Sequence, residues 1–219
     1  MPSLRMVSLL TLLCATPLVA QDKEKLCTDI QNRPMQIGQW AGYRWTGGRT
    51  DGSSMRMALV GTENVGGKPH YWYEIAFDDP SRSRSKTVLQ ILVPGMGFQM
   101  SGVRGLILKS GTEPAMRMPE EMVRMMGSQM GQNFATEFAR KCQETEVVGW
   151  EQITVPAGSF RAMHVRHAAD QTDAWLLPDL YFGLLKATLK DGSAMELTGR
   201  GTDAKSSITE TPQMMPSPR

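Results

Sequence analysis

The sequence predicts an α+β protein that is mainly β, built as a curved antiparallel sheet with one long helix. Two patterns support this fold class: a series of short segments with a period of two, and one long segment with a helical period. The composition agrees, since 41% of the 219 residues are hydrophobic and 21% are charged. These values are typical of a globular domain that can bury a core.

The period-two segments come in pairs that are separated by turn signals. Residues 53–61 and 70–77 flank Gly66-Gly67, and the first of these strands places Met55, Met57 and Leu59 on one face. In the second strand Tyr71, Tyr73, Ile75 and Phe77 share a face. Further pairs are residues 86–93 with 103–109, 146–155 with 160–167, and 183–190 with 193–200 around Asp191-Gly192. Sequential hairpins favour a meandering antiparallel sheet, and a sheet of many strands curls or closes.

A helical insertion is predicted from about residue 119 to 141. Pro119 suits a first helical position, and Glu120 is followed four residues later by Arg124, in the favourable order for a surface ion pair. A helical wheel places five methionines on one broad arc, with Phe134 at its edge: Met118, Met122, Met125, Met126 and Met130.

Three interpretations of this methionine face remain open from the pattern. Soft thioethers bind Cu(I), and Met122, Met125, Met126 and Met130 have suitable spacing, although no His or Cys lies among them. Methionine also fills gaps in ordinary cores. Finally, methionine adapts to ligands of variable shape, so the face could line a cavity for an apolar ligand. We expect the last of these.

No catalytic set is recognisable, so we expect a protein that is not an enzyme and that binds no cofactor and no metal. There is no serine nucleophile elbow and no CxxC motif, and the histidines are His70, His164 and His167. The spacing of His164 and His167 on a strand sends them to opposite faces, and we expect both to be exposed. A net charge of +2 gives no reason to expect nucleic acid as a partner.

The first 20 residues have the layout of a secretory signal peptide. Arg5 precedes an apolar stretch, and Ala20 ends the segment. The stretch is too short for a comfortable membrane span, so we expect an exported, periplasmic protein without a transmembrane segment after cleavage. Cys27 and Cys142 then remain, and an exported chain with two cysteines is expected to form a disulfide between them.

Three C-terminal stretches resemble exported bacterial proteins of the outer-membrane lipoprotein-sorting type, known as LolA and LolB. They are VGWEQITVPAGSFRAMHVR, DAWLLPDLYFGLLKATLKDGSAMELTGRG and AKSSIT, and the order of strands upstream is similar, so that residues 38–209 are covered. The resemblance implies a half-open β-barrel with a helical lid over a hydrophobic cavity that takes acyl chains. The arginine of such carriers cannot be assigned to a residue here, and the methionine-rich insertion is not typical of them.

We therefore expect a signal peptide over 1–20, a single domain over 21–209, and a disordered, proline-rich tail over 210–219. The expected function is non-catalytic binding of an acyl chain, a lipid or a lipoprotein. Two alternatives to this function remain. One is a methionine-rich periplasmic Cu(I)-binding protein. The other is an envelope protein that binds no small ligand and has a structural role or docks on a protein partner. The expected ligand-binding residues are Met118, Met122, Met125, Met126, Met130, Phe134, Tyr71, Tyr73, Ile75 and Phe77.

Overall fold

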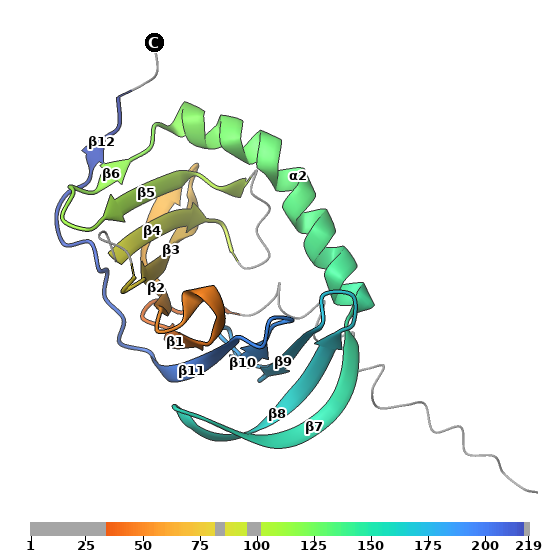
Figure 1. Ribbon diagram of the computed structural model, residues 1–219. Coiled ribbons are helices and arrows are strands. Elements are labelled where there is room, and N and C mark those ends of the chain that lie inside the picture. Colours follow the sequence, from red (N-terminus) through yellow and green to blue (C-terminus); the bar gives the residue numbers. More distant parts are fainter. Residues whose placement is uncertain (1–33, 82–85, 96–101, 217–219) are drawn as a thin grey trace, which may run out of the picture.

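A computed structural model describes residues 34–81, 86–95 and 102–216, and within residues 128–139 it describes only the backbone. The described chain forms one open sheet of 12 strands and one long helix (Figure 1). The strand order is β12-β6-β5-β4-β3-β2-β1-β11-β10-β9-β8-β7. All neighbours are antiparallel except β12 and β6, which are parallel. The expected mainly β class with a curved antiparallel sheet is therefore confirmed.

The predicted hairpins all form. The strands are β1 Trp40–Thr46, β2 Ser54–Val65, β3 Lys68–Asp78, β4 Lys86–Val93, β5 Gly105–Ser110, β6 Met116–Arg117, β7 Glu146–Val155, β8 Gly158–His167, β9 Thr172–Leu176, β10 Leu184–Thr188, β11 Ala194–Gly201 and β12 Gln213–Met214. Gly66 and Gly67 have φ values of 58° and 78°, so both occupy the left-handed region that a tight β2–β3 turn requires. Local turn chemistry thus explains why neighbouring segments pair.

β1 is the strand that joins the two halves of the sheet. It pairs with β2 on one side and with the distant β11 on the other, where Tyr43 lies opposite Leu197. Ala41 and Tyr43 are buried on the same side of this strand. The side chains of β1 alternate as those of a strand do. Its partner β11 lies near the other end of the domain in sequence, so no turn motif between the two strands could predict their pairing.

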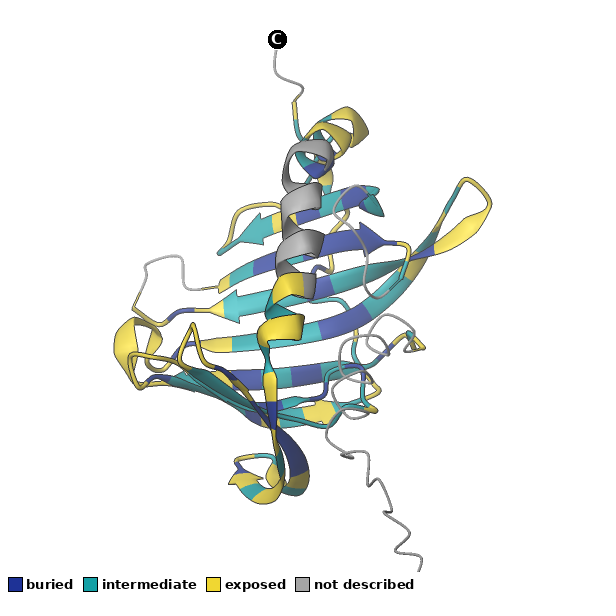
Figure 2. Cartoon of the chain, turned by 90° about the vertical axis from the view of Figure 1, so that its right-hand side faces the viewer, coloured by how far each residue is buried: buried dark blue, intermediate teal, exposed yellow. Residues whose placement is uncertain are grey.

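The sheet curls so strongly that α2, Glu120–Glu144, runs across its open side (Figures 1 and 2). The helix starts one residue after the expected Pro119 and ends three residues after the expected Lys141. At the other end of the sheet the β7–β8 turn folds back on β11, where the Ala157 N–H donates to the Leu197 carbonyl at 3.1 Å. These contacts produce a concave face that is turned toward α2 and a convex face that is turned away.

The two faces carry separate clusters of buried side chains. On the concave face Val123 of α2 packs with Ile91, Val93 and Val103. On the convex face Val88 and Ile107 pack with Ile208 from the C-terminal segment. Both faces of β4 and β5 therefore carry apolar side chains, and both are covered in part.

The C-terminal strap, residues 202–214, covers the convex face and corrects the expected disorder of the tail for residues 210–216. Its main attachment is Glu74 of β3, which is fully buried. The Glu74 carboxylate accepts hydrogen bonds from the Ser207 N–H at 2.9 Å, from the Ser207 hydroxyl at 2.7 Å and from Gln90 Nε2 at 2.8 Å. The strap then ends in β12, which pairs with β6 directly before α2. Residues 217–219 lie outside the described residues.

Candidate functional site

The four expected ligand-binding residues of β3 share the concave face, as their alternation predicted. Tyr71 and Tyr73 pack against the cluster that contains Val123 of α2. Ile75 and Phe77 lie further along the strand, and all four side chains are half-buried. A half-buried apolar side chain on a concave face can contact a ligand, which a fully buried one cannot.

Five apolar side chains from five adjacent strands form a line across this face, which we call the apolar row. The strand register places each opposite the next, and antiparallel partners project to the same side of a sheet. The row consists of Met57, Ile75, Leu89, Leu108 and Met116. Leu108 is 40% exposed and the other four are half-buried.

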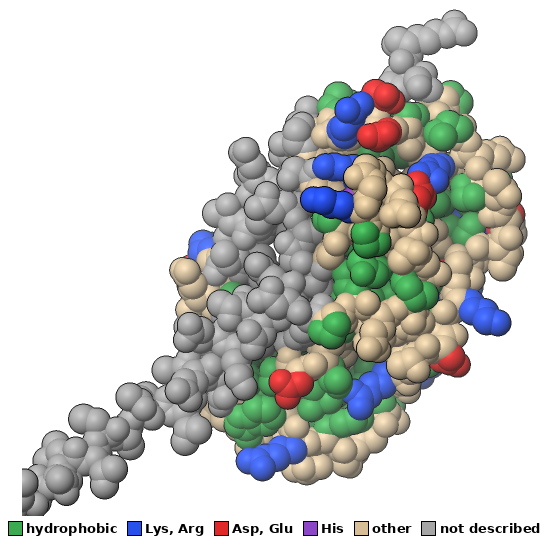
Figure 3. All heavy atoms as spheres, turned by 180° about the vertical axis from the view of Figure 1, so that it is seen from behind, with side chains coloured by type: hydrophobic (Ala, Val, Ile, Leu, Met, Phe, Trp, Pro, Cys, Tyr) green, Lys and Arg blue, Asp and Glu red, His purple; other side chains and the backbone are tan. Residues whose placement is uncertain are grey.

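The neighbouring line of side chains is covered instead. Leu59, Tyr73 and Ile91 follow one another across β2, β3 and β4, and Leu59 and Ile91 are 0% and 9% exposed. Val123 of α2 packs on Ile91 and is itself 3% exposed. The helix therefore packs on one line of the concave face, while the adjacent apolar row keeps part of its surface exposed. Seen from behind, hydrophobic side chains gather in the middle of the molecule with charged ones around them (Figure 3).

Tyrosine hydroxyls lie at the β1 end of the apolar row. The Tyr73 hydroxyl donates to the Met57 sulfur at 2.9 Å, and the Tyr43 hydroxyl donates to the Leu184 carbonyl at 3.2 Å. Burial raises the pKa of Tyr73, Tyr43 and Tyr181, and the nearby Tyr73 raises the pKa of the other two further. All three phenols consequently remain protonated hydrogen-bond donors at neutral pH.

The β9–β10 loop delivers two aromatic residues to this end of the row. Phe182 stacks on Tyr73 with ring centroids 6.0 Å apart, and Tyr181 meets Phe182 edge-on at 4.6 Å. The loop is closed by the Leu177 N–H, which donates to the Gly183 carbonyl at 2.7 Å. A Cβ on residue 183 would lie 2.1 Å from the Leu177 oxygen, so only glycine fits there.

The helix methionines do not all face the sheet. Met118 precedes α2 and packs in the Val123 cluster, and Met122 and Met126 are half-buried. Met125 is 54% exposed, which corrects its expected place on the ligand-facing side. It lies two residues after the buried Val123, about 200° around the helix, so it points away from the sheet.

Several expected features concern residues outside the described part of the chain. The side chains of Met130 and Phe134 are among them, as are the signal peptide and Cys27. Cys142 is disulfide-bonded. Its pairing with Cys27 stays a prediction.

His164 and His167 are buried, at 9% and 8% exposure, which corrects the expectation that both are exposed. They do project from opposite faces of β8. Each lies between two carboxylates, because strands next to β8 and the end of α2 supply acidic residues there. His164 contacts Asp173 at 2.6 Å and Glu151 at 3.2 Å, and it stacks on Trp175 at 4.6 Å.

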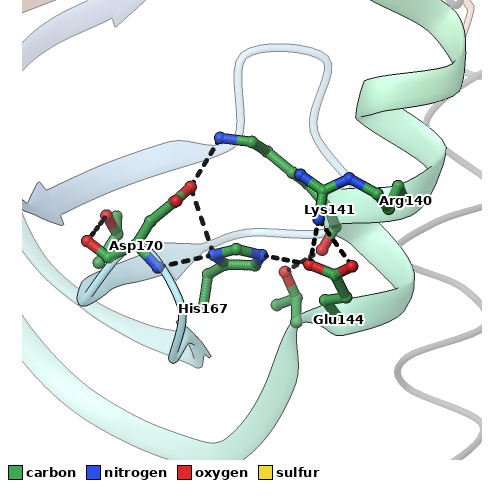
Figure 4. A network of polar contacts seen from close by, with 7 residues as sticks. Arg140, Lys141, Glu144, His167 and Asp170 are labelled. Carbon is green, nitrogen blue, oxygen red and sulfur yellow. Dashed lines mark hydrogen bonds and ion pairs between the residues drawn. The ribbon is translucent and has the colours of Figure 1, made fainter.

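His167 belongs to a polar network that ties the end of α2 to the β8–β9 turn (Figure 4). Its Nε2 lies 3.2 Å from Glu144, and its Nδ1 lies 3.3 Å from the Asp170 carboxylate. Lys141 donates to Asp170 at 2.6 Å, and Arg140 donates to both oxygens of Glu144. We call these five residues the α2 anchor. The hydrogen bond from Arg140 lowers the pKa of Glu144, and that from Lys141 lowers the pKa of Asp170.

Other cavities and clusters within the described residues do not form a better site. A pocket of about 310 Å³ lies beside the C-terminal strap, against Gly42, Arg56, Ala76 and Ser207, and Tyr43 and Phe77 also line it. None of the five residues of the apolar row lines this pocket. This pocket is open to solvent and is lined by both polar and apolar groups, so the apolar row is the stronger candidate site for a hydrophobic ligand. Over the described ranges, no group of three or more His, Cys, Asp or Glu residues could hold a metal ion.

Sequence reasoning missed most of the apolar row and its tyrosine end. Leu89 could not be assigned to the concave face, because β4 has apolar residues on both faces and alternation does not distinguish the two. Tyr43 lies on a strand that was not assigned, although Ala41, Tyr43 and Trp45 alternate as a strand would. Tyr181 and Phe182 lie in a loop, where periodicity carries no signal.

Comparisons with known proteins identify no family. No family model matches the chain, and no curated protein matches it. Among solved structures, a candidate lipoprotein of Parabacteroides distasonis is 13% identical, with a TM-score of 0.36, over 77% of this chain and 97% of its own. A candidate exported protein of Bacteroides fragilis with a YmcC-like fold is 11% identical, with a TM-score of 0.34, over 77% and 98%. Likeness at this level carries no inference about function.

No helix within the described residues is long and apolar enough to cross a membrane.

Proposed function

We propose that this protein is a non-catalytic, LolA-like binding protein of the bacterial envelope that holds an acyl chain or similar apolar molecule along the apolar row. The observation that carries the proposal is the row itself: five apolar side chains in register, one exposed and four half-buried, beside a line of side chains that the helix covers. Soluble proteins rarely expose a contiguous apolar surface, and where they do, the surface is often a binding site. The signal peptide predicted for residues 1–20 supports a periplasmic location.

The row suits a linear ligand for a geometric reason. Neighbouring strands lie about 4.8 Å apart, so five strands span about 19 Å. An extended acyl chain laid across them could contact each side chain in turn. Burial of a methylene group contributes about 0.8 kcal/mol, so about ten buried methylenes could give micromolar affinity after the costs of association.

The experiment is a binding titration with a fluorescent acyl probe, using Leu108→Gln and Leu189→Gln as a matched pair. Leu108 lies in the row and is 40% exposed, while Leu189 is 45% exposed in the β10–β11 turn, outside the row. We expect the first variant to weaken binding about 5- to 30-fold, since a polar group replaces apolar contact worth about 1–2 kcal/mol. The second should bind as the unmodified protein does.

Two results would contradict the proposal. The first is that native mass spectrometry of the protein purified from its own envelope detects no bound lipid, and that the acyl probe does not bind either. The other is equal weakening by the two leucine variants, since that would place binding outside the apolar row.

A further inference from the structure

The charges on β2, β3, β4 and β5 all lie on the convex face. Each alternates along its strand with a residue of the concave face, so its side chain projects the other way. Within the described parts of these strands, the charged residues are Arg56, Glu63, Lys68, Glu74, Asp78, Lys86 and Lys109. The concave surface of the four strands therefore offers apolar side chains and the hydroxyls of tyrosine, threonine and serine, but no charge.

Tyr73 is the hydroxyl best placed to meet a ligand. Its hydrogen-bond acceptor is the sulfur of Met57, a member of the apolar row, at 2.9 Å. A thioether sulfur is a weak acceptor. A carbonyl oxygen that arrived beside Met57 would be a better one, and the hydroxyl could turn to it without leaving another strong acceptor unpaired.

We infer that the preferred ligand is a neutral acyl compound, an ester or an amide, whose carbonyl oxygen accepts a hydrogen bond from Tyr73 while its chain lies along the apolar row. This inference rests on the proposed function and names the ligand class for the same site. A free carboxylate would be disfavoured there, because an ion buried without an opposite charge or several hydrogen bonds loses much of its solvation. A neutral carbonyl loses far less and regains one hydrogen bond.

The surroundings of Tyr73 hold its ring in place for this role. Phe182 stacks on the ring, and Tyr181 supports Phe182 from its edge. The neighbouring Tyr43 hydroxyl is already engaged with the Leu184 carbonyl. Tyr73 is therefore the donor whose present bond costs least to exchange.

The test compares three probes of equal chain length at pH 8: a monoacylglycerol, the free fatty acid, and an alkyl probe without a carbonyl. Each is titrated against the full chain and against Tyr73→Phe and Thr154→Val. Thr154 is the control, because its substitution also removes one hydroxyl, from an exposed position of β7 outside the apolar row. Thermal unfolding of each variant confirms that it folds.

We expect the monoacylglycerol to bind at least about tenfold more tightly than the fatty acid. Tyr73→Phe should weaken monoacylglycerol binding about 2- to 13-fold, the effect of one neutral hydrogen bond. The same variant should leave binding of the alkyl probe unchanged, and Thr154→Val should change binding of neither probe.

The outcomes separate this inference from the proposed function. If the fatty acid binds as well as the monoacylglycerol or better, or if Tyr73→Phe weakens all probes equally, the inference is wrong while apolar binding stands. If none of the three probes binds, the proposed function itself fails.

Discussion

Nε2 of His167 lies 3.2 Å from Oε2 of Glu144, the last residue of α2, and this contact ties the helix to the rim of the sheet. Arg140 and Lys141 add charged hydrogen bonds within the same α2 anchor, to Glu144 and Asp170. At the opposite end of the helix, Val123 is held by apolar packing. The two ends of α2 are therefore attached by different forces, and they should respond differently to pH.

Acid should loosen the anchored end first. The pKa values of Glu144 and Asp170 are lowered in the folded protein, so their ionised forms stabilise it above their ordinary pKa values, near 4.5 and 3.8. That contribution is lost as the pH falls through the lowered values. Hydrogen exchange, corrected for its intrinsic pH dependence, should show protection at residues 140–144 falling below about pH 4 before protection near Val123 does. Glu144→Gln should remove the difference, and Glu120→Gln, at the other end of α2, should not.

The buried carboxylate of Glu74 should be essential for attachment of the C-terminal strap. Glu74→Ala removes the acceptor of two hydrogen bonds from Ser207 and one from Gln90. Both donors of Ser207 lose their acceptor, whereas Gln90 keeps Ser206 as a partner. A partly buried donor left without a partner costs about 1–3 kcal/mol, so we expect a loss of about 2–6 kcal/mol in the free energy of unfolding. Denaturant unfolding measures it. A loss below about 1 kcal/mol would show that the strap is held elsewhere.

Two neighbouring residues of α2 should differ in their effect on stability. Val123 is 3% exposed and packs on the sheet, so Val123→Ala should lower the free energy of unfolding by about 1–3 kcal/mol. Met125 is 54% exposed, and Met125→Gln should change stability by no more than about 0.5 kcal/mol. Paired thermal melts check this. A larger effect at Met125 would contradict the orientation of the helix.

The disulfide at Cys142 should join it to Cys27. Cys142→Ser should lower stability by about 2–5 kcal/mol under oxidising conditions, because the crosslink restricts the unfolded chain. Cys27→Ser should have the same effect, and the double variant should add nothing to either single one. Additive losses, or a disulfide that persists in Cys27→Ser on peptide mapping, would assign a different pairing.

Local patterns were sufficient for the hairpins and for the span of the helix. Turn residues such as Gly66-Gly67 and Gly192 act on their own neighbourhood, so a pair of strands joined by them can be recognised directly. β1 and β12 could not be placed in this way, because their partners β11 and β6 are far away in the chain. A helical wheel showed which methionines share an arc, but the contact at Val123 set the direction of the helix.

The alternation of β3 alone placed Tyr71, Tyr73, Ile75 and Phe77 together on one face, since a strand sends every second side chain to the same side. Alternation could not predict which apolar surface remains accessible to a ligand, because β4 and β5 carry apolar side chains on both faces. Tertiary packing decided that point. The C-terminal strap covers the convex face, Val123 covers one line of the concave face, and the apolar row beside that line remains half-exposed.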